Sequence, residues 1–229
     1  MNTLPNTAIL IFANSSKEDC CRKSILHGEN LFDSLTDYTI KKVERTGLPY
    51  FHFSEKDQVG ANFGERFTHA IRSVFYKGFE NIITIGNDTP QLKTSHLHVA
   101  IEALKNGKTV LGPSLDGGFY LLGIHKSEFN PYVFNQLPWQ RFDLLNKISY
   151  FFKNSNCSVF NLPALQDLDT IKDVTRLNNF THSISSRIRA LFTTLIGIAN
   201  GIINKVRLSV YTYFFQIPFN KGSPLSLVN

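Results

Sequence analysis

The sequence predicts an α/β fold in which a mainly parallel β-sheet is covered by helices on both faces. Six short apolar runs are rich in β-forming residues, and most are continuous rather than alternating, a pattern typical of strands buried on both faces. Helix-like stretches alternate with these runs, which favours a parallel sheet. With 229 residues, of which 42% are hydrophobic, the chain can form a large core without disulfides.

The expected elements alternate along most of the chain. Strands are expected at residues 8–13, 50–53, 81–86, 109–112, 119–124 and 158–162, and helices at residues 29–46, 64–77, 94–106 and 142–153. In such sheets, ligands bind beyond the carboxyl ends of the strands, where loops leave the sheet. We therefore expect functional residues directly after strands, and the polar motifs of this chain lie there.

The net charge of +6 is concentrated near the C-terminus. The chain has no Asp or Glu after His182, and that segment carries the basic residues Arg187, Arg189, Lys205, Arg207 and Lys221. We therefore divide the chain into a catalytic domain at residues 1–182 and a basic amphipathic helical tail at residues 183–229. The body that remains is close to neutral, which argues against a nucleic-acid partner.

Cysteine usage and the N-terminus favour a cytoplasmic protein. Cys20 and Cys21 are adjacent, which suits a structural disulfide poorly, and no zinc-type spacing links them to Cys157. The first apolar run, at residues 8–13, is too short for a signal peptide or a membrane span. It is predicted to be a buried strand.

The first functional motif follows the strand expected at residues 81–86. Gly86 is followed by Asn87 and Asp88, so one carboxylate stands at the tip of a buried strand. A hard cation such as Mg²⁺ or Mn²⁺ takes an oxygen ligand of this kind and completes its coordination with water and phosphate oxygens. The alternative is that Asn87 and Asp88 only form a turn before the helix expected at residue 94.

The second motif places Asp116 and the pair Gly117 and Gly118 between two apolar runs. Glycines at such a place let the backbone approach a ligand closely or adopt positive φ. The alternative is a plain hairpin, because Asp-Gly is a favoured hairpin turn.

Two basic segments are candidates for binding phosphate. A glycine-containing loop runs into a helix that carries Arg66 near its start, and helix N-termini and arginine side chains both suit phosphate. A second basic segment follows the first strand. The candidate residues are Gly60, Gly64, Arg66, Lys17, Arg22 and Lys23. The alternative for both segments is that their charged side chains are simply solvated.

A late acidic motif, residues 165–173, includes Asp169 and Thr170. Either residue is well placed to cap the helix that follows. The alternative is that Asp169 is a second metal ligand.

Taken in this order, the motifs resemble the bacterial family called domain of unknown function 2064, a glycosyltransferase A-like family. The resemblance rests on Gly-x-x-x-Gly-Glu-Arg at residues 60–66, Gly-x-Asp-x-Pro at residues 86–90 and Gly-Pro-x-x-Asp-Gly-Gly-x-Tyr-x-Leu-Gly at residues 112–123. It rests further on Leu-Pro-Trp ending at Trp139 and on Asp-x-Asp-Thr at residues 167–170. The family is related by fold to nucleotide-sugar glycosyltransferases and small nucleotidyltransferases.

The resemblance implies a three-layer αβα, GT-A or nucleotide-diphospho-sugar transferase fold. It makes Asp88 the metal and nucleotide aspartate, Asp116 the second characteristic carboxylate, and Asp169 a late metal ligand. The chain departs from the family in the first loop, where residues 14–23 replace the usual lysine-containing loop. It departs also at Thr89, where the family often has Cys.

The resulting hypothesis is a metal-dependent glycosyltransferase that uses a nucleoside-diphosphate sugar. Asp116 would face an acceptor as general base or orienting group, and Trp139 would form an apolar platform there. The nearest alternative is nucleotidyl transfer from a nucleoside triphosphate, with release of pyrophosphate. Another alternative is a nucleotide-binding or membrane-associated protein whose catalytic site has decayed. The sequence does not identify the sugar or the acceptor.

The tail shows apolar residues every three or four positions from residue 184 onward, which predicts an amphipathic helix. Either this helix packs on the body, or it lies on an anionic membrane at the inner face. We expect the first arrangement; the basic residues and the cluster Tyr211, Tyr213, Phe214 and Phe215 are consistent with the second. Because the motifs end by about Val174, we expect the tail to be dispensable for folding of the body.

Overall fold

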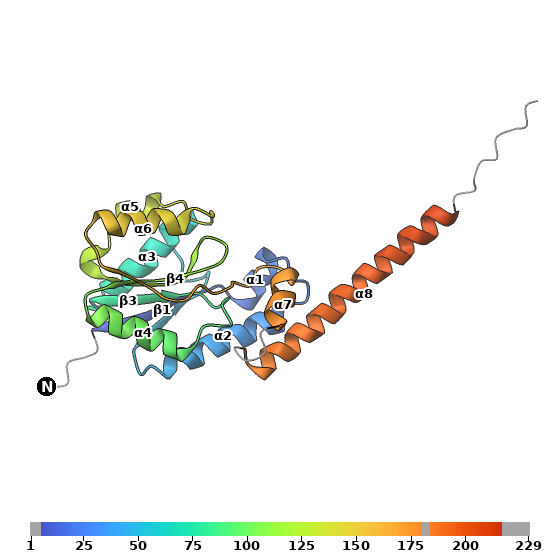
Figure 1. Cartoon of the computed structure of the whole chain (residues 1–229), viewed down its shortest axis with the longest axis horizontal. Coiled ribbons are helices and arrows are strands. Elements are labelled where there is room, and N and C mark those ends of the chain that lie inside the picture. Colours follow the sequence, from blue (N-terminus) through green and yellow to red (C-terminus); the bar gives the residue numbers. More distant parts are fainter. Residues whose placement is uncertain (1–5, 180–183, 217–229) are drawn as a thin grey trace, which may run out of the picture.

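The computed structural model describes residues 6–179 and 184–216, with side chains described as far as Val206. It contains a six-stranded sheet in the order β2-β1-β3-β5-β4-β6 (Figure 1). The strands are β1 (Thr7–Phe12), β2 (Tyr50–Phe53), β3 (Asn81–Ile85), β4 (Thr109–Pro113), β5 (Phe119–His125) and β6 (Val159–Asn161). Because β5 alone runs antiparallel to its neighbours β3 and β4, the sheet is mixed and mainly parallel, which confirms the predicted fold class.

Strands β1 and β3 form the buried centre of the sheet. They pair in parallel with Ile9 opposite Ile83 and Leu10 opposite Thr84, and residues 8–11 are fully buried. A strand covered on both faces needs apolar side chains at every position. The continuous apolar runs of the sequence therefore predicted these strands within one or two residues of their bounds.

Helices cover both faces of the sheet and make three layers (Figure 1). On one face lie α2 (Glu29–Glu44) and α4 (Thr94–Lys105), packed on Ile9, Ile11, Ile83 and Ile85. On the other lie α3 (Phe63–Phe75), α5 (Pro131–Gln136) and α6 (Leu144–Asn154), packed on the alternate side chains, which include Leu10. This alternation follows from the two-residue repeat of a strand.

Short helices form in segments whose residue pattern predicts secondary structure less clearly. Residues of the expected basic loop form α1 (Ser16–Arg22), whose N-cap Ser15 accepts a hydrogen bond from the backbone of Glu18. The helix α7 (Ile171–Asn178) begins at Thr170, whose side chain accepts a hydrogen bond from the backbone of Asp173. Thr170 therefore caps a helix, as one alternative for this motif predicted. A 3₁₀ turn, η1 (Lys126–Glu128), follows β5.

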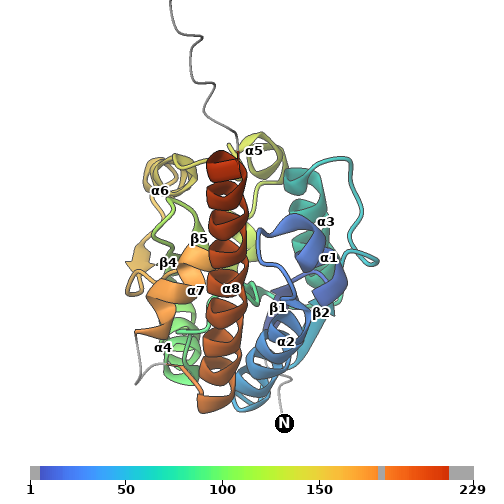
Figure 2. The same ribbon diagram turned by 90° about the vertical axis from the view of Figure 1, so that its right-hand side faces the viewer.

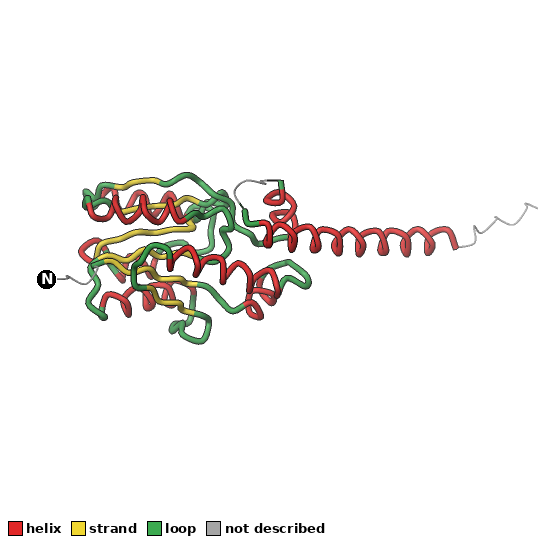
Figure 3. The backbone as a smooth tube through the Cα atoms, turned by 90° about the horizontal axis from the view of Figure 1, so that it is seen from below, coloured by secondary structure: helices red, strands yellow, loops and turns green. Residues whose placement is uncertain are grey.

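The last helix, α8 (Ser186–Gln216), packs on the body only in its first turns. Ile188, Phe192 and Leu195 are buried against α2 and α7 in a third apolar cluster, and Figure 2 shows α8 beside both helices. Beyond these turns the helix projects away from the body (Figures 1 and 3). None of the helices described here combines the length and hydropathy needed to cross a membrane.

Two expectations for the tail fall outside the described residues. The division at residues 182 and 183 lies within residues 180–183, so it stays a proposal. The aromatic cluster at residues 211–215 lies where side chains are not described. Because Ile188, Phe192 and Leu195 are buried, we no longer expect the whole tail to be dispensable. We expect only the part of α8 beyond these residues to be dispensable for folding of the body.

We predict that a chain ending at Gly197 keeps nearly the stability of the full chain, whereas a chain ending at Ser185 is destabilised by several kcal/mol. The shorter chain loses the large buried side chains that cover α2 and α7, and each such loss costs about 2–5 kcal/mol. Denaturant-induced unfolding of both fragments measures the difference. Equal stability of the two fragments would show that α8 contributes nothing to the core.

Candidate active site

Four loops meet at the carboxyl edge of the sheet. Backbone hydrogen bonds join them: the amide of Leu168 donates to the carbonyl of Asp88 at 2.9 Å, and the amide of Leu165 donates to the carbonyl of Pro113 at 3.0 Å. A bridge between Ser24 and Thr170 adds the segment after α1. The loops after β1, β3 and β6 and the β4–β5 turn therefore form one connected surface.

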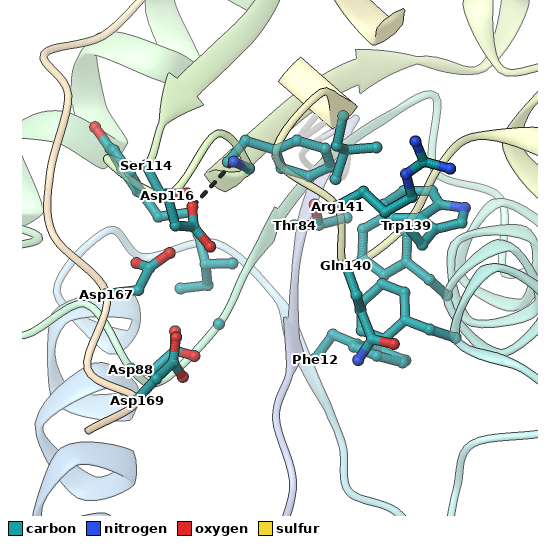
Figure 4. Close-up of a pocket in the computed structure, with 18 of the residues that line it drawn as sticks. Phe12, Thr84, Asp88, Ser114, Asp116, Trp139, Gln140, Arg141, Asp167 and Asp169 are labelled. Carbon is teal, nitrogen blue, oxygen red and sulfur yellow. Dashed lines mark hydrogen bonds between the residues drawn. The ribbon is translucent and has the colours of Figure 1, made fainter. Parts of the chain in front are cut away.

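A cavity of about 420 Å³ opens at this edge (Figure 4). One wall is acidic and consists of Asp88, Asp116, Asp167 and Asp169. The opposite wall is aromatic and consists of Phe12, Phe63, Phe67, Phe119 and Trp139. We call these the acidic wall and the aromatic wall. The cavity thus offers a charged side and an apolar side to one ligand.

A second cavity, of about 290 Å³, adjoins the first and shares Asp88 and Asp169 with it. Its lining includes Arg22, Lys23 and Arg66, which come from α1, the residue after it and α3. The two basic segments predicted to bind phosphate therefore meet in space, although they lie far apart in the sequence. We call this space the basic cavity.

Lys23 is held by oxygen atoms of the acidic wall. Its Nζ lies 2.8 Å from Oδ2 of Asp88 and 3.2 Å from Oδ1 of Asp169, and it donates to the carbonyl of Leu168 at 2.9 Å. Only 12% of the side chain is exposed. Although burial lowers the pKa of Lys23, Asp88 and Asp169 raise it above its usual value. Lys23 is therefore a permanent cation between two carboxylates.

One lysine leaves the acidic wall with excess negative charge. Burial raises the pKa of Asp167 well above its usual range, and the nearby Asp88 carboxylate raises it further. Burial also raises the pKa of Asp169, although Lys23 opposes this change. Both carboxyl groups therefore stand where an additional positive charge would stabilise them.

The loop that carries Asp88 is held from three sides. Asn87 is buried and donates to Oγ1 of Thr36 at 2.9 Å, while Thr89 donates to Asp167 at 2.5 Å. From the third side, the buried ammonium of Lys42 lies 3.4 Å from the carbonyl of Pro90. These contacts fix the backbone on both sides of Asp88, whose carboxylate lines both cavities.

Asp116 lies in the turn between β4 and β5 and lines the cavity. Its carboxylate accepts hydrogen bonds from the hydroxyl of Ser114 and from the amide of Gly118. Gly117 has a φ of +94°, and a Cβ there would lie 2.1 Å from the carbonyl oxygen of Phe142. The segment is thus a hairpin, as the alternative predicted, and it also presents a carboxylate to the cavity.

Trp139 belongs to the aromatic wall, on the side of the cavity opposite Asp116 (Figure 4). Its Nε1 donates to the carbonyl of Phe134 at 2.6 Å, and its ring packs on Phe63 and Phe67. Gly64 makes room for it, since a Cβ at Gly64 would lie 2.6 Å from the indole ring. The ring is therefore fixed by its contacts within the protein.

The remaining predicted residues lie farther from the acidic wall. Arg22 pairs with Glu18 at the surface, at 2.6 Å. Lys17 is exposed on α1, and neither Lys17 nor Gly60 lines the two cavities described here. Gly60 has a φ of +144° and packs closely on Glu65. A direct role in binding for Lys17, Arg22 and Gly60 stays a prediction.

The structure adds residues that the sequence did not single out. Asp167 stands in the acidic wall, yet the sequence pointed only to Asp169, two residues later. Thr89 had no expected role, yet its hydroxyl binds Asp167. The Asp-x-Asp spacing was a signal for both aspartates, because residues two apart in an extended segment point to the same side. Only the fold shows that this side faces the cavity.

The oxygen atoms around Lys23 fit a hard divalent cation. Asp88, Asp169 and the carbonyl of Leu168 already converge on one positive charge, and oxygen is the donor that Mg²⁺ and Mn²⁺ prefer. No group of three or more His, Cys, Asp or Glu side chains among the described residues is arranged to hold a metal. Mg²⁺ commonly uses only one or two carboxylates when phosphates complete its coordination. The fit requires that Lys23 moves aside.

The fold and the site together define an α/β protein with a cavity lined by charged side chains at the carboxyl edge of its sheet. Residues 43–141 match the family model described as "Uncharacterized protein conserved in bacteria (DUF2064)". This match confirms the predicted resemblance to the domain of unknown function 2064 family. Asp88, Asp116 and Trp139 lie inside the matched segment, whereas Lys23, Asp167 and Asp169 lie outside it.

Solved structures support the same fold. A Desulfovibrio desulfuricans protein provisionally assigned as a nucleotide-diphospho-sugar transferase matches with a TM-score of 0.74 and 22% identity, covering 88% of this chain and 98% of that one. This likeness confirms the predicted GT-A-like fold. No curated protein sequence matches the chain.

Two more distant structures have TM-scores below 0.5. Rv0371c from Mycobacterium tuberculosis, solved with manganese, has a TM-score of 0.43 and 14% identity, over 75% of this chain and 97% of that one. A Bacillus anthracis protein provisionally assigned as a glucose-1-phosphate thymidylyltransferase has a TM-score of 0.45 and 11% identity, over 78% and 96%. Likenesses at this level carry no functional conclusion.

Lys42 gives the site a testable dependence on pH. Burial lowers the pKa of its ammonium from 10.5 to about 7, so between these values the unfolded chain binds a proton that the folded chain does not. The contribution of Lys42 therefore lowers the free energy of unfolding most below pH 7. This free energy rises with pH between about 7 and 10.5. We predict that Lys42→Met flattens this rise by a few kcal/mol.

Unfolding free energies of wild type and variant between about pH 7 and 10 measure the effect. Lys41→Met is the matched control, because it removes the same charge from an exposed neighbour on α2. The same pH profile in wild type and Lys42→Met would show that Lys42 is protonated in the folded protein.

Proposed function

We propose that the protein is a glycosyltransferase that uses a nucleoside-diphosphate sugar, with Mg²⁺ or Mn²⁺ held by Asp88 and Asp169. The observation that carries this proposal is the position of Asp88, which lies between the basic cavity and the cavity with the aromatic wall. A donor of this kind has a diphosphate in its middle and a sugar at one end. The basic cavity suits the diphosphate, and the aromatic wall suits the apolar faces of sugar rings.

Charge explains why such a donor needs a cation here. Four carboxylates face the main cavity, and Lys23 compensates them only in part. A diphosphate brought next to this wall would be repelled by several kcal/mol, as unit charges about 4 Å apart interact by ~4 kcal/mol near a protein surface. A divalent cation at Asp88 and Asp169 would neutralise the charge that develops on the leaving nucleotide.

Lys23 and Arg66 have complementary roles in this proposal. In the structure, Lys23 neutralises Asp88 and Asp169. If these carboxylates held a cation instead, the Lys23 ammonium would be released toward the basic cavity that it already lines and would donate to phosphate oxygens there. Arg66, from α3, lines the same cavity and adds a planar donor suited to phosphate.

Asp116 and Trp139 are assigned to the acceptor side. Asp116 is exposed to the cavity and anchored by Ser114 and Gly118, so its carboxylate is positioned to accept a proton from an acceptor hydroxyl. Trp139 faces it across the cavity and supplies an apolar surface (Figure 4). The structure gives no residue that identifies the acceptor.

Asp88→Asn tests the proposal directly. The variant keeps the fold, because the two side chains are nearly isosteric, but it removes an anionic ligand. We predict that Mn²⁺ strengthens the binding of a nucleoside diphosphate to wild type, and that Asp88→Asn loses most of this gain, on the order of a few kcal/mol. Calorimetric titration with and without Mn²⁺ measures both values.

Asp116→Asn is the matched control for this experiment. It makes the same chemical change across the cavity, so it should keep the metal-dependent affinity and lose turnover. Product analysis completes the test. Release of a nucleoside diphosphate supports glycosyl transfer, release of pyrophosphate assigns nucleotidyl transfer, and binding without any turnover indicates a decayed site. An equal gain from Mn²⁺ in wild type and Asp88→Asn would leave Asp88 without a metal role.

Lys23→Gln tests whether the lysine and the cation share one position. Removing the ammonium frees both carboxylates, so we predict Mn²⁺ binding without nucleotide that is roughly tenfold tighter than in wild type, which corresponds to ~1.4 kcal/mol. Mn²⁺ titration followed by electron paramagnetic resonance measures free ion directly. Thermal unfolding adds a second readout, because Mn²⁺ should stabilise the variant more than wild type.

Arg22→Gln is the matched control for Lys23→Gln. It removes the same charge one residue away, but Arg22 pairs with Glu18 at the surface. Mn²⁺ affinity should therefore stay at the wild-type value. Equal affinity in Lys23→Gln and wild type would show that the cation does not bind at the place of the lysine.

A further inference from the structure

The apolar stripe of α8 continues beyond the part of the helix that packs on the body. Ile188, Phe192 and Leu195 are buried against α2 and α7. At the same spacing of three and four residues, the stripe runs on to Ile202 and Val206, which are 40% and 56% exposed. An apolar stripe that follows the helical repeat is expected to cover another surface. The outer half of α8 therefore presents the same face as the inner half, without the body beneath it.

The exposed face is wide enough to be a docking surface. Ile198 and Ile203 flank Ile202 and Val206, and they are 37% and 61% exposed. A helix turns by ~100° per residue, so these four side chains share an arc of roughly 140°. The opposite side carries the small and polar residues Thr193, Gly197, Asn200, Gly201 and Asn204. The four exposed apolar residues, which we call the projecting face, are therefore separated from the small and polar side of the helix.

The charged residues of α8 are all basic, and two of them occupy helix positions at the edges of the projecting face. The helix contains Arg187, Arg189, Lys205 and Arg207, and it contains no Asp or Glu. At ~100° per residue, positions 205 and 207 fall on the two opposite edges of the apolar arc. Basic residues at these edges can keep their charges in the head-group layer while the apolar face enters the acyl boundary.

We propose that the projecting face of α8 docks on an anionic membrane surface. The apolar arc supplies burial, and the basic edges supply attraction to acidic lipids, worth about 1 kcal/mol for each Lys or Arg near the surface. A second copy of the chain fits less well as the occupant. Two such helices would bring only positive charges together, whereas helix pairs commonly use opposite charges beside the apolar seam.

The position of the helix suits such docking. Figures 1 and 3 show α8 leaving the body and extending well beyond it. Its inner turns are fixed by α2 and α7, so docking of the outer turns would hold the whole catalytic body near the membrane. This inference does not depend on the reaction that the site performs.

Vesicle sedimentation of the full chain tests the proposal. We expect wild type to bind vesicles of phosphatidylcholine and phosphatidylglycerol, and to bind pure phosphatidylcholine vesicles less tightly. The double variant Ile202→Asp with Val206→Asp places charges on the projecting face and should lower vesicle affinity at least about tenfold. Both side chains are exposed, so the core remains intact, and circular dichroism verifies that the helix is retained.

The double variant Asn200→Asp with Asn204→Asp is the matched control. It adds the same two negative charges on the opposite side of the helix, so it should bind vesicles more tightly than the Ile202→Asp and Val206→Asp variant. Equal loss in both variants would overturn the proposed role of the apolar face. Absence of vesicle binding by wild type would also overturn the proposal. So would a dimer of wild type without lipid, if the Ile202→Asp and Val206→Asp substitutions abolished it and the control substitutions did not.

Discussion

The ion pairs of Lys23 with Asp88 and Asp169 hold the candidate site together. Lys23 directly follows α1, Asp88 lies in the loop after β3, and Asp169 lies in the loop after β6. Without the lysine, two carboxylates would face each other next to Asp167, whose pKa burial and Asp88 already raise. Their mutual repulsion would then have no compensating charge among these residues. The present arrangement of the three loops therefore depends on one cation at their centre.

The sheet lowers the energetic cost of this arrangement, because it fixes the positions of the loops before any ligand binds. The parallel pairing of β1 and β3 places the ends of both strands at the same edge, and the fully buried segment of β1 anchors them. The antiparallel β5 then brings the turn with Asp116 to that edge as well. Opposite the carboxylates, α3 and the segment around Trp139 supply apolar contacts. The division into acidic and aromatic walls thus follows from strand direction and helix placement.

The sequence predicted those parts of the fold and site that depend on local pattern. Continuous apolar runs revealed the strands, and the rule that loops at strand ends bear ligands pointed to Asp88 and Asp116. The sequence could not show that the Lys23 side chain lies against Asp88, because the two residues are brought together only by the parallel sheet. It also could not show that Gly64 makes room for Trp139, or that Asp167 faces the cavity beside Asp169. Such contacts are set by tertiary packing, which has no local signal.

The same packing connects the site to the projecting helix. Lys23 lies just before α2, and Asp169 lies just before α7. The amide of Ser24 donates to the carbonyl of Asp169 at 3.2 Å, which joins the two segments directly. Both helices then pack against the inner turns of α8 through Phe32, Leu177 and Phe192. The two partners in the central ion pair are therefore carried by the two segments that anchor α8.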